Sequence, residues 1–257
     1  MLIAILSTAA FAVIVWATVI NTEGWAKVQQ GFFDPATALE ALPKVWDGFL
    51  INLTVLGISI FTVGAVALLI ALLRTLRGPV FFPVRAVAAG YTDLFRGLPF
   101  IIVLYLVGFG LPTIVGERID ELFLGILAVT LTYSAYVAEV IRAGIESVHP
   151  SQRLAARALG LNHVQTLRRV VLPQALRKMT PALMNDFISM QKDVGLISII
   201  AGLDAIARAK GVVATTYNFT PYVVAGILFI LLAIPTIRLT DWYTARLRER
   251  EQSGSVL

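Results

Sequence analysis

Two long stretches without a charged residue constrain this chain more than any other feature. Residues 48–73 and 211–237 contain no Asp, Glu, Lys or Arg over 26 and 27 positions, respectively. About 20 apolar residues are enough for a helix to cross the hydrocarbon core of a membrane. Composition agrees, because 58% of the chain is hydrophobic and only 14% is charged, against about 25% charged in ordinary soluble domains. The sequence therefore predicts an all-α integral membrane protein and excludes a soluble or disordered chain.

Four further stretches predict helices that cross the membrane, over residues 2–20, 86–111, 122–142 and 180–201. The first also has the length of a secretory signal peptide, but it lacks the positive start and the small-residue cleavage site of such a peptide. We therefore expect it to be retained as an extra transmembrane helix. The expected organisation is this helix with an external loop over 1–46, a membrane core over 47–245 and a cytoplasmic tail over 246–257.

Basic residues gather in two loops that lie on the same side of this arrangement. Residues 74–85 carry three Arg and no acid, and residues 142–178 carry seven basic residues against one acid, Glu146. Loops rich in Lys and Arg stay in the cytoplasm, so we expect the N-terminus, the loop between Pro150 and Pro173 and the C-terminus to be cytoplasmic. The same loops account for the net charge of +5. No basic stretch is interleaved with aromatic residues, so nucleic-acid binding is not indicated.

The loop between Pro150 and Pro173 predicts two short helices joined at a glycine. Residues 152–159 form the first, and Gly160 supplies a left-handed end. Asn162, with Gln165 three positions later, is a capping pair for the second helix, over 163–172. Pro173 should interrupt or kink that helix. The residues alone leave two interpretations, an amphipathic helix pair lying on anionic lipid or a docking element for a cytoplasmic partner.

Three charged residues fall within the predicted span over 180–201. Each costs about 2.5–3.5 kcal/mol at a membrane-helix centre, so Asp186, Lys192 and Asp193 need compensation. Asp186 and Asp193 share a helical face, and Lys192 is about 100° from Asp193. Either a Lys–Asp pair only neutralises charge, or the three line a water-filled site for a zwitterion. Two acids against one Lys favour a cationic amino acid unless Arg96 faces the same cavity; Arg96 could instead reach the cytoplasmic interface.

The remaining polar residues do not predict catalysis or metal binding by the chain itself. Glu139 and Arg142 are three positions apart and are expected to pair. The chain has no Cys, and His149 and His163 lack the neighbouring ligands of a metal site. The sequence has no G-x-x-x-x-G-K-[ST] motif for nucleotide and no constellation of nucleophile and base for a membrane enzyme. We therefore expect no catalytic residue, no metal and no cofactor.

Four motifs in order resemble the permease (transmembrane) subunits of ABC importers, in the polar-amino-acid permease family. Ala155, Ala156, Gly160 and the ending Val170, Leu172, Pro173 are similar to the EAA loop of these permeases. DLFRGLPF over 93–100, AYVAEVIRAGIESV over 135–148 and VVLPQALRKMTPALMNDFISMQKD over 170–193 are similar to the polar-amino-acid branch. The resemblance covers roughly residues 47–245.

The resemblance implies a five-helix permease core plus one extra N-terminal helix, in a prokaryotic cytoplasmic membrane. It implies an amino-acid importer with a separate P-loop ATPase subunit, a second permease subunit in a homo- or heterodimer, and an extracytoplasmic amino-acid-binding protein. Substrate contacts are expected at Asp186, Lys192 and Asp193, with Arg96 as a further candidate. Contacts to the ATPase are expected in the loop, at Gln152, Leu154, Ala155, Ala156, Gly160 and Leu161. The alternatives are a permease for another small polar solute and a non-transporting scaffold.

The chain departs from the family pattern at four positions. Leu154 stands where the EAA loop has Glu, which puts one polar contact to the ATPase in doubt. Leu98 replaces Thr in the FRGTP pattern, and Val194 and Gly195 replace Thr and Ser in the KDTSL pattern. These three replacements lie beside the expected substrate residues and bear on which solute is carried.

Overall fold

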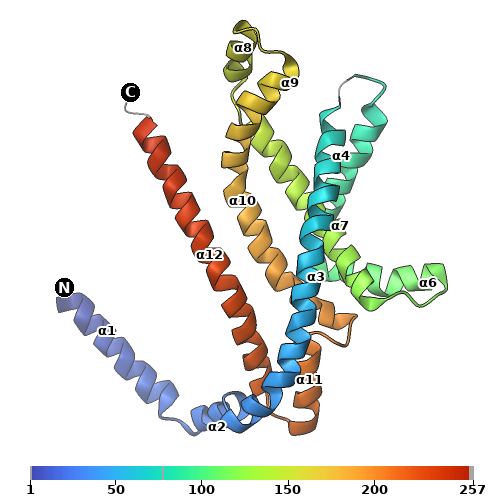
Figure 1. Ribbon diagram of the computed structural model, residues 1–257. Helices are drawn as coiled ribbons and strands as arrows, with labels where there is room; N and C mark the ends of the chain where they lie inside the picture. Colours follow the sequence, from blue (N-terminus) through green and yellow to red (C-terminus); the bar gives the residue numbers. More distant parts are fainter. Residues whose placement is uncertain (1, 77, 255–257) are drawn as a thin grey trace.

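A computed structural model describes residues 2–76 and 78–254, and within these ranges the chain is helical without strands (Figure 1). Short π or 3-10 segments connect several of the α-helices, at Trp16–Ile20, Leu106–Gly110, Leu167–Val171 and Val194–Ile199. The α-helices are α1 (Leu2–Val15), α2 (Glu23–Phe32), α3 (Pro35–Thr75), α4 (Phe82–Gly97), α5 (Phe100–Tyr105), α6 (Leu111–Val115), α7 (Glu121–Glu146), α8 (Pro150–Ala158), α9 (His163–Thr166), α10 (Leu172–Asp193), α11 (Ala205–Thr216) and α12 (Thr220–Gly254).

Three helical stretches of the described chain are long and apolar enough to cross a membrane, and a bent pair adds a fourth. The three are Glu23–Thr75, Glu121–Glu146 and Thr220–Leu247, and the pair joins Phe82–Gly97 to Phe100–Val115. Helix α10 has the length of a span but carries five charged residues. In Figure 1, α3, α4, α7, α10 and α12 run alternately up and down, and α8, α9 and the C-terminal end of α12 lie at one end. This order agrees with the predicted core.

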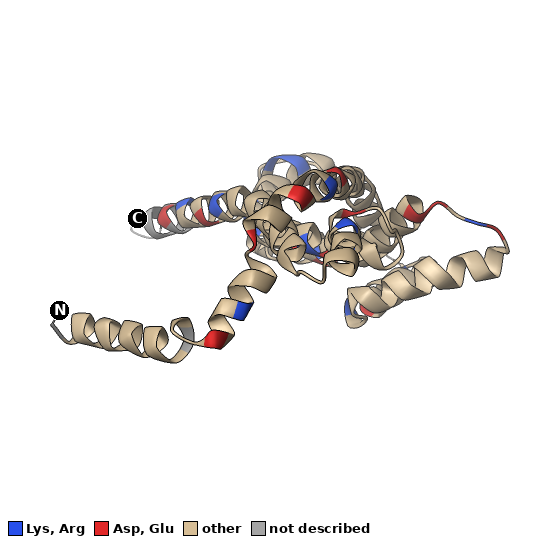
Figure 2. Cartoon of the chain, turned by 90° about the horizontal axis from the view of Figure 1, so that it is seen from below, with Lys and Arg blue, Asp and Glu red and all other residues tan. Residues whose placement is uncertain are grey.

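Helix α1 stands apart from the core. Its described side chains are exposed except for Val15, which is half-buried, and Figure 2 shows it without a charged residue, projecting from the body together with α2. The core begins earlier than the predicted boundary after residue 46. Asp34 caps α3 by accepting the backbone N–H of Thr37 at 2.9 Å, so that boundary falls inside a helix.

The predicted continuous span over 86–111 is wrong, because the helix breaks at Leu98 and Pro99. Leu98 is extended, with φ −93° and ψ 135°, as the residue before a proline tends to be. The two helical parts on either side are bent by 107°. The hydropathy of the stretch continues through the break and gives no sign of it. The break exposes Leu98 and Pro99 to the interior of the bundle.

The sixth predicted span, placed within residues 211–237, is α12, but it does not occupy the whole uncharged stretch. Helix α11 ends at Thr216, and Tyr217 follows with a left-handed φ of 53°. The long helix α12 begins only at Thr220. It continues to Gly254, so the described part of the predicted tail is helical. The absence of charged residues predicted the membrane region correctly but did not reveal the turn at Tyr217.

A buried polar network fixes the end of α10 against α3. Asn52 donates from Nδ2 to the carbonyl of Val194 and to Oδ2 of Asp204, each at 3.1 Å, and accepts the N–H of Ala205 at 3.0 Å. All three polar partners lie in a region from which water is excluded, where an unmade hydrogen bond is costly. Gly48 lets the backbone at Asp204 approach closely, since a Cβ there would lie 2.5 Å from its carbonyl carbon. The network therefore positions the turn that follows Asp193.

The helices between Pro150 and Pro173 agree with the sequence prediction at the turn and the cap that join them. Gly160 has φ +81° and ends the turn after α8. Asn162 and Gln165 form a reciprocal capping box at the start of α9. Pro173 does not stop the helix: a π-helical turn precedes it, and α10 continues from Leu172. Such a turn accommodates a proline, which lacks the N–H of the regular pattern.

Candidate functional site

A polar cavity of about 280 Å³ lies where the broken α4–α5 segment, α7 and α10 meet. Two carboxylates and two tyrosines face it among otherwise small or apolar groups. It is lined by Leu98, Pro99, Phe100, Thr132, Tyr133, Tyr136, Asp186, Ser189 and Asp193. No Lys or Arg belongs to this lining.

The two carboxylates of the cavity differ in their partners. Tyr133 donates its hydroxyl to Oδ2 of Asp193 at 2.7 Å, which aims that carboxylate. Oδ2 of Asp186 is buried and has no hydrogen-bond partner in the described chain. A buried carboxylate oxygen without a donor is costly, so Asp186 presents an acceptor that a cationic group would satisfy.

The structure brings only part of the predicted substrate set together. Asp186 and Asp193 both line the cavity, seven positions apart on one face of α10. The side chain of Lys192 is exposed and is not part of the lining. Since neighbouring positions differ by about 100° around a helix, the cavity lies on the side of Asp193 and away from Lys192. None of the ion pairs in the described residues joins Lys192 to Asp193.

Arg96 lies beside the cavity without being part of its lining. Its carbonyl accepts the hydroxyl of Tyr136, a lining residue, at 3.2 Å. On its other side, Nη1 is 3.9 Å from Oε2 of Glu139. Arg96 therefore connects a residue of the cavity wall to the carboxylate of Glu139.

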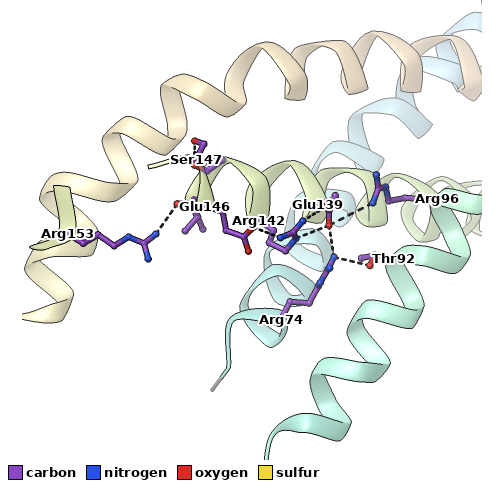
Figure 3. A network of polar contacts seen from close by, with 10 residues as sticks. Arg74, Thr92, Arg96, Glu139, Arg142, Glu146, Ser147 and Arg153 are labelled. Atoms are coloured by element: carbon purple, nitrogen blue, oxygen red, sulfur yellow. Dashed lines mark hydrogen bonds and ion pairs between the residues drawn. The ribbon is translucent and has the colours of Figure 1, made fainter. Parts of the chain in front are cut away.

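Glu139 is the centre of an ion cluster that joins three helices (Figure 3). It accepts from Arg142 in an ion pair along α7, as predicted, and from Arg74 of α3 at 2.7 Å. Arg74 also donates to the hydroxyl of Thr92 on α4 at 3.0 Å. Arg142 pairs in addition with Glu146. Because Arg74, Glu139 and Thr92 are largely buried, the cluster holds α3, α4 and α7 together beside the cavity.

The lining tyrosines and hydroxyls were missed by sequence reasoning. Thr132, Tyr133, Tyr136 and Ser189 are uncharged and carry no motif of their own. One signal was available: Ser189 lies between Asp186 and Asp193 at helical spacing, so all three share a face. Tyr133 is placed by its contact from α7 to α10, which no pattern within one helix reveals.

The predicted docking loop carries an exposed apolar surface. On α8, Ala156 is buried against the molecule, whereas Gln152, Leu154 and Ala155 are exposed. The exposed fraction of Leu154 is 68%, and that of Leu159, just before Gly160, is 83%. Leu161 is half-buried. No group of three or more His, Cys, Asp or Glu residues in the described chain is arranged to hold a metal.

Known proteins of similar sequence and structure agree on the kind of protein. The family model "Binding-protein-dependent transport system inner membrane component" matches residues 79–249. The arginine transport system permease protein ArtQ of Bacillus subtilis (strain 168) is 32% identical over 203 residues, covering 78% of this chain and 91% of that protein. The probable glutamine ABC transporter permease protein GlnM of the same bacterium is 34% identical over 190 residues, covering 74% and 86%.

A solved structure described as an amino acid ABC transporter with histidines has a TM-score of 0.75 and 31% identity, covering 83% of this chain and 98% of its own. An alginate ABC transporter gives a TM-score of 0.57 at 14% identity, which supports the fold alone. These matches confirm the resemblance to ABC importer permeases. The chain is therefore a multi-pass membrane protein that belongs to the family of binding-protein-dependent transport system inner membrane components, whose ATP hydrolysis takes place on a separate subunit and whose substrate arrives on a binding protein.

Proposed function

We propose that this chain is the permease subunit of an importer for a cationic amino acid such as arginine or lysine, in the cytoplasmic membrane of a prokaryote. The observation that carries the proposal is the cavity between α5, α7 and α10, which holds two carboxylates and no lining cation. Its volume of about 280 Å³ is at the small end of ligand pockets. It suits a solute of amino-acid size better than an oligosaccharide. The names of the arginine and glutamine permeases among the relatives support an amino acid as the substrate.

The two carboxylates have distinct roles in this proposal. Asp186, whose Oδ2 has no partner in the described chain, accepts the side-chain ammonium or guanidinium of the substrate. Asp193, aimed by Tyr133, accepts the α-amino group. Such charge-assisted hydrogen bonds are about twice as strong as neutral ones. Phe100 and Tyr136 add ring surface on which a cation packs favourably.

Arg96 and Lys192 complete the proposed substrate set from outside the lining. Arg96 lies outside the lining and contacts the substrate from the edge of the cavity. Lys192 is exposed on this chain, so it contacts the substrate carboxyl group only where a second permease subunit closes the site. A homodimer of this chain provides such a second subunit, and so does a heterodimer with a related chain.

The loop around α8 is the proposed contact to the ATPase. Gln152, Leu154, Ala155, Gly160 and Leu161 form the contacting surface. Ala156 supports it from beneath, because its side chain is buried. Leu154 makes an apolar contact where the family has a charged one.

Transport by proteoliposomes that contain the complete importer tests the substrate site. Asp186→Asn keeps the shape and removes the charge, so binding-protein-dependent uptake of radiolabelled arginine should fall at least about tenfold, which corresponds to about 1.4 kcal/mol. Glu40→Gln is the matched control, because Glu40 forms an exposed pair with Lys44; uptake should stay within about twofold. Unchanged uptake with Asp186→Asn would refute the proposed site.

A double variant separates substrate binding from simple charge neutralisation. Asp193→Asn alone should lower arginine uptake while the amount of inserted protein is retained. If Lys192 and Asp193 only neutralise each other, Lys192→Gln combined with Asp193→Asn restores both protein level and uptake. Restored uptake in the double variant contradicts a substrate role for Asp193.

A further inference from the structure

A second cavity, of about 140 Å³, lies between α10 and the C-terminal part of α12, away from the substrate cavity. It combines two arginines, two aromatic rings and one aliphatic side chain. Its lining consists of Arg177 from α10 and of Trp242, Tyr243, Arg246 and Leu247 from α12. Nothing in the transport of an amino acid requires this combination.

Both arginines of this cavity lack an acidic partner. No ion pair of the described residues includes Arg177 or Arg246, and both side chains are exposed. Arg246 is held over the ring of Trp242, with its guanidinium carbon 4.3 Å from the ring centroid. Asp241 and Glu249 are neighbouring acids on α12, but neither lines the cavity. Two guanidinium groups from different helices thus line one space whose lining contains no acid.

The position along α12 places this cavity at the level of lipid headgroups. Trp242 is 22 positions beyond Thr220, which at 1.5 Å per residue is about 33 Å along the helix. The hydrocarbon core is about 30 Å thick, and the uncharged stretch of α12 ends at Ile237. Trp and Tyr collect at this boundary. The free arginines therefore face the layer in which lipid phosphates lie.

We propose that Arg177 and Arg246 bind the phosphate of an anionic phospholipid, with Trp242, Tyr243 and Leu247 packing against its glycerol and upper acyl chain. The guanidinium fork matches phosphate oxygens in geometry and charge. A ring that already holds Arg246 in place reduces the side-chain freedom lost on binding. Only the choice of leaflet depends on the predicted orientation of the chain, which makes it the cytoplasmic leaflet. A bound lipid joins α10, which carries the substrate carboxylates, to the end of α12.

Lipid binding to the full chain, purified in detergent with its ATPase subunit, tests the site. Native mass spectrometry during titration with phosphatidylglycerol gives the apparent affinity, with phosphatidylcholine as the zwitterionic comparison. Arg177→Gln combined with Arg246→Gln should weaken phosphatidylglycerol binding at least about tenfold, with little change for phosphatidylcholine. Arg168→Gln combined with Arg238→Gln is the matched control, because both residues are exposed and neither lines the cavity. The control should stay within about twofold.

Three results would overturn the proposal. Equal losses of phosphatidylglycerol affinity in both double variants indicate that the lipid is attracted to the whole basic surface and not to this cavity. Loss of the ATPase subunit without a change in lipid affinity indicates that the arginines contact that protein instead. Arginine-dependent binding of inorganic phosphate without binding of phosphatidylglycerol indicates a small-anion site. Arg177→Lys with Arg246→Lys, which keeps both charges, should retain a measurable part of the lipid affinity and shows that the glutamine variants do not fail by misfolding.

Discussion

At the scale of single residues, the carboxylate of Glu139 carries more contacts than any other side chain near the cavity. It is shared by Arg74, Arg142 and, more loosely, Arg96. Glu139 and Arg74 are 19% and 17% exposed, so water screens them little. Removing one partner of such a pair leaves an uncompensated charge. Glu146, by contrast, is 62% exposed, and a pair of that kind contributes under about 1 kcal/mol.

Glu139→Gln should therefore destabilise the protein by about 3 kcal/mol, the usual cost of stranding a buried charge. Glu146→Gln should change stability by less than about 1 kcal/mol. The two variants are compared by heating them in detergent and measuring the remaining monodisperse protein by size-exclusion chromatography. Equal thermal stability of the two variants would mean that the cluster does not hold α3, α4 and α7 together.

At the scale of elements, the turn between α8 and α9 links local geometry to partner binding. Gly160 has φ +81°, a region that β-branched residues resist. A Cβ at this position would meet no other atom. A substitution therefore acts through the backbone of the turn and not through a clash.

Gly160→Val should reorient the exposed Leu154 and Leu159 and lower ATPase activity that depends on the binding protein by at least about fivefold, about 1 kcal/mol in binding to the ATPase subunit. Membrane insertion should be unchanged. Gly226→Val is the control, because Gly226 lies in α12 with an ordinary helical backbone and open space for a Cβ. Full ATPase stimulation in the Gly160 variant would show that this turn is not part of the contact.

Sequence patterns located elements better than they located breaks. Residues 122–142 were predicted as a span and lie within α7, because the uncharged run over 122–138 indicates its membrane part. The capping box at Asn162 was predicted because it is a local contact. Gly97 and Pro99 indicate loosened helix geometry at Leu98, but the predicted bounds of that span followed hydropathy, which continues through the break. The hydrogen bond from Tyr133 to Asp193 was missed because two helices far apart in sequence create it.

At the scale of the whole molecule, the alternating helices place the basic loops and the docking surface at one end. In Figure 1, α8, α9 and the C-terminal end of α12 share that end, and α2 and α11 lie at the other. The positive-inside rule assigns the first end to the cytoplasm.

Because the chain has no cysteine, single cysteines report this orientation directly. Ser151→Cys should react with a membrane-impermeant maleimide only in inverted vesicles or after permeabilisation, whereas Glu117→Cys should react in intact cells. Labelling of position 151 from outside would reverse the topology and with it the assignment of the ATPase contact.

The break at Leu98 and Pro99 has an electrostatic consequence for the cavity. It places the C-terminal end of α4 and the N-terminal end of α5 side by side at the cavity wall, where both flanking residues belong to the lining. A helix has partial negative charge at its C-terminus and partial positive charge at its N-terminus, and broken membrane helices use these ends to hold ions of opposite sign. The break therefore brings main-chain partial charges of both signs to the wall of the same cavity.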